Sequence, residues 1–195
     1  KKPEMGTHTV PLTREIYIER EDFMVDAPKK FFRLKPDGEV RLMGAYIVKC
    51  NEIVKDDNGE IVEIRCTADL ETRNGMPVDG RKVKGATIHW VDAATALDAE
   101  VRVYSELFSD PAPDGADKDF LACMNPDSLE VLTGCKVEPR MRDIAAAYDK
   151  TEKKGKTAPS FQFMRLGYFC LDNKDCSEEH LVFNRSVTLK DSFKK

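Results

Sequence analysis

Two strand-like stretches near the end of the chain decide how the rest is interpreted: FQFMRLGYF at residues 161–169 and LVFNRSVTL at residues 181–189. Polar and apolar side chains alternate along both, and aromatic and β-branched residues are frequent, which is typical of half-buried strands. The polar segment DNKD at 172–175 lies between them and predicts a turn. We therefore expect a hairpin or an adjacent strand pair here.

The first stretch carries a charge where alternation predicts an apolar face. Phe161, Phe163 and Phe169 fall on one side of an extended strand, and Arg165 falls on the same side. Gln162 belongs to the opposite side. An arginine among three phenylalanines is the unusual feature of this predicted strand.

The same residues resemble the end of the glutaminyl-tRNA synthetases, a class I family. The resemblance rests on Phe-Gln-Phe-x-Arg-x-Gly-Tyr-Phe at 161–169 and on Val-Phe-Asn-Arg-x-Val-x-Leu-Lys-Asp at 182–191. Further matches follow in family order: IYIEREDF at 16–23, GEVRL at 38–42, DGRKVKG at 79–85, IHWV at 88–91 and EVRVY at 100–104. The resemblance covers nearly the whole chain and implies the C-terminal anticodon-binding region, with a eukaryotic source.

Size and charge are compatible with several classes of protein. The chain has 195 residues, of which 41% are hydrophobic, and this supports a folded core. No apolar run approaches the roughly 20 residues of a membrane-spanning helix, and no signal-peptide pattern opens the sequence, so we expect a cytoplasmic protein without membrane contact. The net charge of -4 argues against nucleic-acid binding unless the basic residues cluster. They do, at Lys29, Lys30, Arg33, Lys35 and Arg41, and again at Arg81, Lys82 and Lys84.

Many short alternating strands with turns between them predict an all-β fold with a few short helices. We expect strands at 15–20, 40–50, 61–67, 83–91, 100–104 and 128–132, a helical turn at 92–95, and helices at 117–123 and 139–148. The Lys-rich segment 149–159 is predicted to be a mobile loop. The resemblance implies two β-barrels of the ribosomal-protein-like anticodon-binding type. Residues 1–30 and 107–195 would form the proximal barrel, and residues 31–106 the distal one.

The sequence shows neither a catalytic motif nor a metal motif. There is no P-loop, no G-x-S-x-G and no class I nucleotide-binding signature, so we expect no catalytic residue and no cofactor in this chain. The resemblance assigns ATP to the full-length enzyme. Six cysteines without a C-x-x-C pair predict reduced, mostly buried thiols: Cys50, Cys66, Cys123, Cys135, Cys170 and Cys176. Cys170, Cys176 and His180 have no fourth ligand nearby, so we expect no metal site.

RNA recognition fits the residue types better. Proteins read single-stranded RNA loops by stacking on unpaired bases and by bonding to their edges, which calls for arginine, glutamine and aromatic side chains. By resemblance, Gln162 and Arg165 read the middle anticodon base, Arg33 the third and Arg41 the first. Where the bacterial pattern has other residues, this chain has Lys30 before Arg33, and Met43 on the predicted face of Arg41. Phosphate contacts are expected from Lys29, Lys35, Arg81 and Lys82.

Each assignment has a structural alternative. Arg165 could be ion-paired beneath the barrel, Gln162 could be a plain solvent-facing strand residue, and Arg33 and Arg41 could be ordinary surface charges. At the level of function, the alternatives are a β-barrel interaction module of a synthetase complex and the matching region of a glutamyl-tRNA synthetase. The partners implied by the resemblance are tRNA for glutamine, the catalytic domain of the same chain, and other synthetases.

Overall fold

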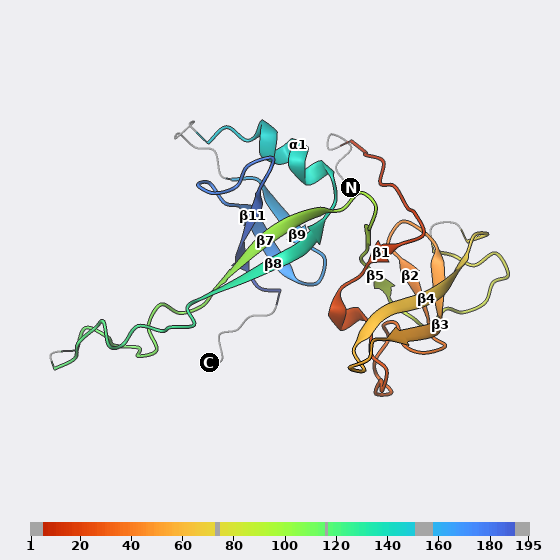
Figure 1. The fold of residues 1–195 in the computed structure, drawn as a ribbon, viewed down its shortest axis with the longest axis horizontal. Helices are drawn as coiled ribbons and strands as arrows, with labels where there is room; N and C mark the ends of the chain where they lie inside the picture. The colour runs from red at the N-terminus through yellow and green to blue at the C-terminus, as the bar shows by residue number, and fades with distance from the viewer. Residues whose placement is uncertain (1–5, 73–74, 116, 151–157, 190–195) are drawn as a thin grey trace. The chain divides into compact units, whose positions relative to one another are not determined.

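The computed structural model describes residues 6–72, 75–115, 117–150 and 158–189. The chain divides into two compact units (Figure 1): residues 11–94 form one, here called the middle unit, and residues 1–10 with 95–195 form the other, here called the C-terminal unit. The predicted boundaries differ from this division. The prediction groups segment 11–30 with the C-terminal residues and segment 95–106 with the middle ones, whereas the structure groups them the other way round.

The C-terminal unit is built on a five-stranded sheet with the order β8-β7-β11-β10-β9. Its strands are β7 (Leu97–Tyr104), β8 (Leu129–Val137), β9 (Ser160–Phe163), β10 (Gly167–Leu171) and β11 (Leu181–Val187). Strands β10 and β11 are antiparallel neighbours joined through a turn at 173–175, which confirms the predicted strand pair. Strand β11 also runs parallel to β7.

Helix α1 (Arg140–Ala147) contributes Met141 and Ala145 to the core of this unit, which also includes Leu181, Val182 and Phe183 of β11. Phe169 and Phe183 are buried at the centre, and the ring of Phe163 stacks on Phe169 with centroids 4.5 Å apart. Each fully buried phenylalanine contributes roughly 1.5–3 kcal/mol of transfer free energy. Helix α1 confirms the prediction for 139–148. It begins after Pro139, whose fixed φ suits a helix start.

Segment 161–169 is a hairpin, and its prediction as one strand is wrong. Strand β9 ends at Phe163, the chain turns through 164–166, and β10 returns from Gly167. The amide of Leu166 donates to the carbonyl of Phe163 at 3.0 Å, which closes the turn. A Cβ on Gly167 would lie 2.7 Å from the carbonyl oxygen of Val187, so the return needs glycine. Arg165 therefore lies in the turn and leaves the phenylalanine face.

The middle unit contains a four-stranded sheet and a two-stranded one. The first has the order β4-β3-β2-β5, with β2 (Glu39–Leu42), β3 (Ile47–Lys55), β4 (Ile61–Asp69) and β5 (Thr87–Ile88). The second pairs β1 (Ile16–Tyr17) with β6 (Val91–Asp92), and a 3-10 turn follows β1 at Arg20–Asp22. Val40 and Ile88 are wholly buried in the core. The predicted turn at 56–59 joins β3 to β4 and is confirmed.

Segment 40–50, predicted as one long strand, is also a hairpin. Strand β2 ends at Leu42, and β3 begins at Ile47. Between them Gly44 adopts a φ of 69°, and the amide of Leu42 donates to the carbonyl of Tyr46 at 2.9 Å. Met43 therefore lies in a turn, and the expectation that it shares a strand face with Arg41 is wrong.

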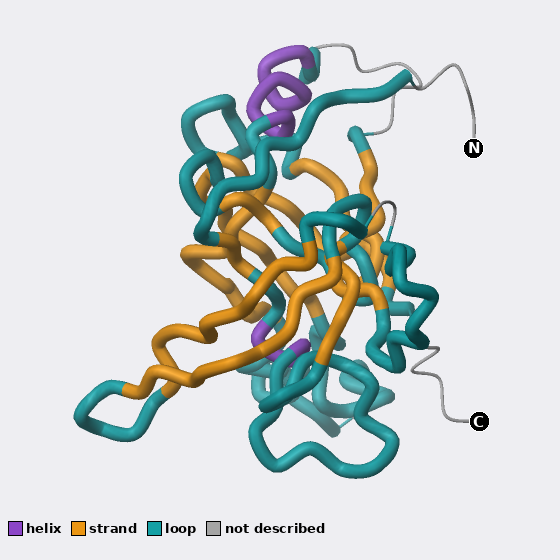
Figure 2. The backbone as a smooth tube through the Cα atoms, turned by 90° about the vertical axis from the view of Figure 1, so that its right-hand side faces the viewer, coloured by secondary structure: helices purple, strands orange, loops and turns teal. Residues whose placement is uncertain are grey.

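Strands dominate the regular structure (Figure 2), so the mainly-β prediction is confirmed. The described residues hold one α-helix and one 3-10 turn, and their sheets are open and not closed into barrels. Segment 117–123 forms turns in place of the predicted helix. Asp92 ends β6 and accepts bonds from the amide and hydroxyl of Thr13, at 2.7 and 2.6 Å, and residues 93–95 form a turn after it.

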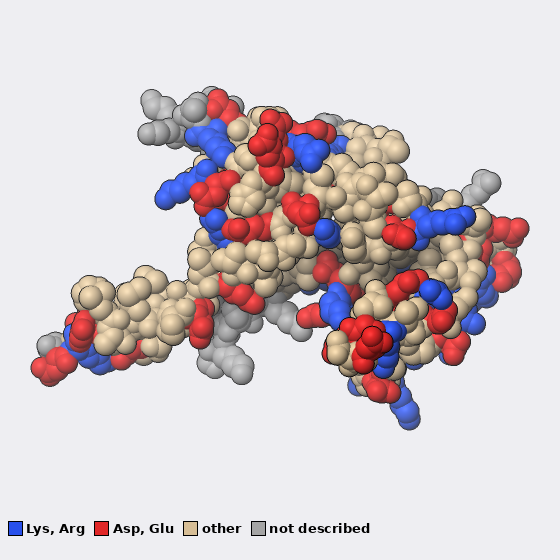
Figure 3. All heavy atoms as spheres, in the orientation of Figure 1, with Lys and Arg blue, Asp and Glu red and all other residues tan. Residues whose placement is uncertain are grey.

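Residues 105–128 connect β7 to β8 as a long arm. Phe108 pairs with Met124 across it, and the side-chain amide of Asn125 donates to the carbonyl of Glu106 at 2.9 Å. Uncharged atoms cover most of the visible face of the arm (Figure 3), and Leu107, Phe120 and Leu121 are more than half exposed. Backbone and side-chain hydrogen bonds define the arm, because it has no buried core of its own.

The remaining predictions concern the loop at 149–159 and membrane-spanning helices. The Lys-rich loop predicted at 149–159 lies largely outside the described residues, since positions 151–157 are not among them. Within the described part of the chain, no helix is long and apolar enough to cross a membrane.

Candidate functional site

The β9–β10 hairpin brings Gln162 and Arg165 to neighbouring places. Gln162 is exposed on β9, directly opposite Tyr168 of β10, and Arg165 is half-buried in the turn that joins the two strands. The structure thus places the two predicted readers of the middle base on one hairpin. Gln162 faces away from the phenylalanine core, as the alternation predicted.

Arg165 holds a strained backbone conformation. Its φ is 64°, in the left-handed region that glycine and asparagine prefer. A bulky L-residue there costs roughly 1–2 kcal/mol, and such strain persists where surrounding structure or function requires it. The side chain has an interaction within the fold, so it is not free. Its place in the turn takes Arg165 off the phenylalanine face of the sheet.

Near this hairpin, a charged network holds the 172–175 turn against the sheet. Arg102 on β7 donates to Glu100 at 2.7 Å and to Asp175 at 2.6 Å, and it lies 3.5 Å from Asp172. The amide of Asn184 on β11 donates to Asp172 at 2.8 Å. The pKa of Arg102 is raised, first by its bond to Asp175 and then by Glu100. The network couples β7, β11 and the turn.

Burial raises the pKa of Asp172, but hydrogen bonds outweigh it and leave that pKa below its ordinary value. The donors are the backbone amides of Asp175 and Lys174 and the side chain of Asn184, with a further contribution from the charge of Arg102. Sequence reasoning missed this network, since Arg102 and its bonded partner Asp175 are 73 positions apart and no motif marks them.

Arg33 is partly engaged in the middle unit. Its Nε lies 3.3 Å from the carboxylate of Asp22, which is 1% exposed, and its Nη1 donates to the carbonyl of Glu21 at 3.0 Å. Phe32 beside it is 57% exposed. Arg33 thus pairs with a buried carboxylate and also borders an exposed aromatic ring, so it is more than an ordinary surface charge.

Arg41 is held by three backbone carbonyls. Its Nε donates to Gly75 at 2.8 Å, Nη1 to Gly85 at 2.8 Å and Nη2 to Val83 at 3.2 Å. Much of the guanidinium fork is therefore engaged by loop 75–85. Met43, the other residue expected near the first base, contributes its carbonyl to the indole N–H of Trp90 at 3.0 Å. The two residues have separate surroundings.

The predicted phosphate contacts fall into two groups. Arg81 bonds to Asp69 at 2.6 Å, to Asp79 at 3.1 Å and to Glu39 at 3.5 Å, and its pKa is raised, mainly by Asp69. Lys29, Lys30 and Lys82 are exposed, Lys35 is half-buried, and none of these four has an ion pair with the described residues. The lysines are thus available for phosphate, whereas Arg81 is already neutralised.

The thiols and acidic groups form no metal centre within the described residues. All six cysteines are unpaired by disulfides, but only Cys50 and Cys176 are buried, so the expectation of mostly buried thiols is wrong. Cys66 lies opposite Cys50 on neighbouring strands, and desolvation followed by the charge of Cys50 raises its pKa to about 11. A neutral thiol with such a pKa is a poor nucleophile.

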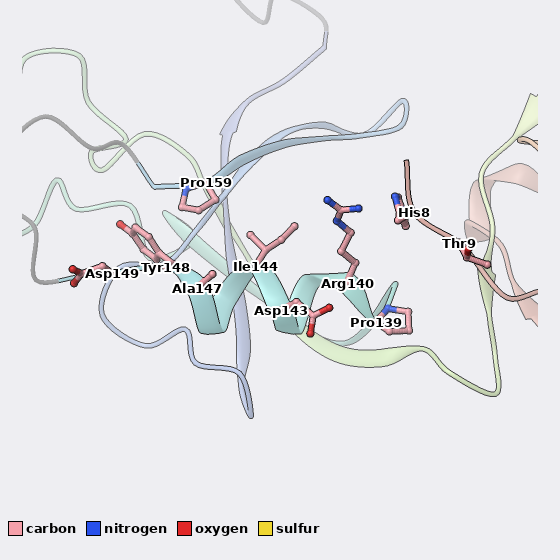
Figure 4. Close-up of a pocket in the computed structure, with 10 residues that line it drawn as sticks. All are labelled: His8, Thr9, Pro139, Arg140, Asp143, Ile144, Ala147, Tyr148, Asp149 and Pro159. Carbon is pink, nitrogen blue, oxygen red and sulfur yellow. The ribbon is translucent and has the colours of Figure 1, made fainter. Parts of the chain in front are cut away.

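A hollow of about 870 Å³ lies beside α1 in the C-terminal unit. Figure 4 shows Arg140, Ile144 and Tyr148 of this region together with His8 from the start of the chain. His8 bonds to Glu138 at 3.0 Å, which ties the first described residues to this unit. None of the predicted anticodon or phosphate residues lines the hollow.

Comparison with known proteins identifies the class. Residues 1–69 and 87–172 match two family models that are both described as the anticodon-binding domain of class I tRNA synthetases (E and Q). The chain belongs to this family of anticodon-binding domains. The hairpin with Gln162 and Arg165 lies across residues 160–171, within the second match.

The relatives are more specific. The chain is 50% identical to the glutamine–tRNA ligase of Vibrio vulnificus and 52% identical to that of Vibrio campbellii, each over 194 residues that cover all of this chain and 32% of the relative. The ligase of Clostridium perfringens is 50% identical, with 33% of its length covered. The chain thus spans about a third of the curated relatives that it matches. These relatives are bacterial and give no support to the predicted eukaryotic source.

Proposed function

We propose that this chain is the anticodon-binding region of a glutamine–tRNA ligase and that it recognises the anticodon loop of tRNA for glutamine. The observation that carries the proposal is the β9–β10 hairpin, which presents an exposed amide and a strained arginine within a chain that is about half identical to glutamine–tRNA ligases. Such residues suit the reading of unpaired bases.

The chemistry of recognition follows from the two side chains. The Gln162 amide can donate and accept at once, so it can match the mixed edge of a pyrimidine, and the Arg165 guanidinium donates only. We assign the middle anticodon base to this pair and the third base to Arg33. Lys30 is a further candidate beside Arg33. The first base is assigned to Arg41, with Met43 as a second candidate to test, although the bonds of Arg41 to three carbonyls weaken that assignment.

The remainder of the proposal concerns the longer protein. Two thirds of each relative lies outside the match, and we propose that this portion supplies a catalytic domain in the same chain that uses ATP to attach glutamine. Because tRNA is charged for protein synthesis in the cytoplasm, we propose that the longer protein acts there. The two units would correspond to the distal and proximal anticodon-binding barrels, with the C-terminal unit as the proximal one.

Binding of the chain to tRNA for glutamine, measured with footprinting of the RNA, tests the proposal. We expect protection confined to the anticodon loop, and weaker binding to tRNA for glutamate. Gln162→Ala should reduce the discrimination by roughly 1–3 kcal/mol, the scale of one good base-edge contact. Ser160→Ala is the matched control, because Ser160 is exposed on the same strand and its hydroxyl donates to the nearby carbonyl of Ala158 at 3.1 Å.

Equal affinity for tRNAs with unrelated anticodons would contradict the proposal and would favour a module that binds proteins. Protection outside the anticodon loop would contradict the assignment of the hairpin. A preference for tRNA for glutamate would move the chain to the other specificity of its family.

A further inference from the structure

The residue opposite Gln162 in the β9–β10 hairpin is an exposed tyrosine. Tyr168 of β10 pairs in register with Gln162 of β9. Directly opposed residues of antiparallel strands project from the same face, with Cβ atoms about 4.5–5.5 Å apart. The tyrosine ring and the glutamine amide are therefore neighbours on the face of the sheet that lies away from the phenylalanine core.

The ring of Tyr168 is accessible. Its residue is 45% exposed, and Val187, its partner on the other side in β11, is 57% exposed. The phenol forms no hydrogen bond with the described residues, and only the backbone carbonyl of Tyr168 accepts a side-chain bond. The face of the ring is thus available to a planar ligand.

The backbone beneath the ring is well fixed. Strand β10 lies between β9 and β11, so Tyr168 is held by ladders on both sides. The hydroxyl of Ser186 also donates to the carbonyl of Tyr168 at 3.0 Å. A tyrosine has only two side-chain torsions to order, and a fixed strand leaves little further entropy to lose on binding.

We propose that Tyr168 is the stacking platform for the anticodon base whose edge Gln162 reads. A base lying flat on the ring presents its edge sideways, toward the neighbouring amide. Every base has a π-face, so the ring supplies affinity without identity, and the amide supplies identity. Arg165 lies in the turn that joins the two strands and can reach the same base from its other side.

This inference rests on the proposed function, and the test separates the two. The probe is a synthetic hairpin with the anticodon loop of tRNA for glutamine, alone and with each of the three anticodon bases removed in turn. Binding is measured for the wild-type chain, Tyr168→Ala, Tyr168→Phe and Tyr104→Ala. Tyr104 is the matched control, because it is 50% exposed on β7 of the same sheet but does not pair with Gln162.

Tyr168→Ala should lose about 5- to 150-fold in affinity, the range for one base–aromatic stack, while Tyr168→Phe stays within about twofold of wild type. The loss should vanish on the hairpin that lacks the base read by Gln162, because no base then stacks on the ring. Tyr104→Ala should bind as wild type does. Unfolding curves of all three variants confirm that they fold.

Wild-type binding with no loss in Tyr168→Ala would overturn the platform and leave the proposed function standing. A loss that persists on all three abasic hairpins would also overturn it, since the ring would then act on the RNA backbone. If the wild-type chain does not bind the intact hairpin, the proposed function fails and the platform fails with it.

Discussion

The two units place polar side chains of similar type in different surroundings. In the middle unit, Arg41 is bound by three carbonyls and Arg81 by three carboxylates. In the C-terminal unit, Gln162 is exposed, and Arg165 stands in a strained turn beside it. Family resemblance assigned all of these residues to RNA, but the fold distinguishes them.

The difference shows how a guanidinium can be structural or functional. Its planar fork of donors fits carbonyls in a loop as well as it fits the edge of a base or a phosphate. Arg41 fastens loop 75–85 to β2, whereas Arg165 holds a backbone conformation that is costly for a bulky residue. We expect the first kind of residue to control stability and the second kind to control recognition.

The largest expected effect is on stability, in Arg41→Ala. Removal of the fork leaves the carbonyls of Gly75, Val83 and Gly85 without their donor, and each charge-assisted bond contributes roughly 1.5–3 kcal/mol. Water replaces part of this at a half-buried site, so we expect a loss of about 3 kcal/mol in the free energy of unfolding by urea. Arg65→Ala is the control, because its ion pairs with Glu52 and Glu63 are solvent-exposed and should contribute little. Unchanged stability in Arg41→Ala would contradict the structural role and strengthen the assignment of this side chain to the first anticodon base.

The next effect concerns acid stability and Asp172. The pKa of this carboxyl is lower in the folded chain than its ordinary value near 3.9, so the folded state is favoured above that pH, and the advantage is lost as the pH falls through the folded pKa. Asp172→Asn should cost about 1–2 kcal/mol at pH 7 and should flatten the loss of stability below about pH 4. The check is a series of urea titrations between pH 2 and 7, with Asp57→Asn in the exposed β3–β4 turn as control. A variant with the wild-type acid profile would show that the network does not depend on this charge.

A smaller effect isolates the strain at Arg165. Both Arg165→Gly and Arg165→Ala remove the side chain, but only glycine relieves the φ of 64°, so the glycine variant should be more stable by about 0.5–1 kcal/mol. At Gln162 on β9 the order should reverse, because glycine is unfavourable in a strand interior. Thermal unfolding of the four variants measures both differences. If the alanine variant is at least as stable as the glycine variant at position 165, the turn is not strained in solution.

The smallest effect concerns the salt dependence of binding. Lys82 is exposed, and each phosphate contact to a single strand changes the slope of log K against log salt by about 0.7. Lys82→Ala should lower the slope by about this amount for every tRNA tested, while Arg81→Ala should leave the slope unchanged because its charge is already paired. Affinities measured between 50 and 200 mM salt decide it. If Arg81→Ala changes the slope and Lys82→Ala does not, Arg81 contacts phosphate and Lys82 does not.

The local features of this protein follow from short stretches of its sequence. Alternation and turn residues identified the strands around 61–67 and 100–104, the turns at 56–59 and 172–175, and the helix after Pro139, because each depends on neighbours within a few positions. Resemblance added the family and the hairpin residues Gln162 and Arg165. The face shared by Gln162 and Tyr168 was also visible in the alternation.

The places where the predicted strands 40–50 and 161–169 fold back depend on tertiary contacts. Apolar side chains continue through both turns and conceal them, and the glycines at 44 and 167 were the only local signals. It also decided which arginines are engaged, since the carbonyls that hold Arg41 lie 34 to 44 positions away. The hydrogen-bond partners of a donor depend on which distant segments the fold brings together. Alternation within one strand cannot predict those partners.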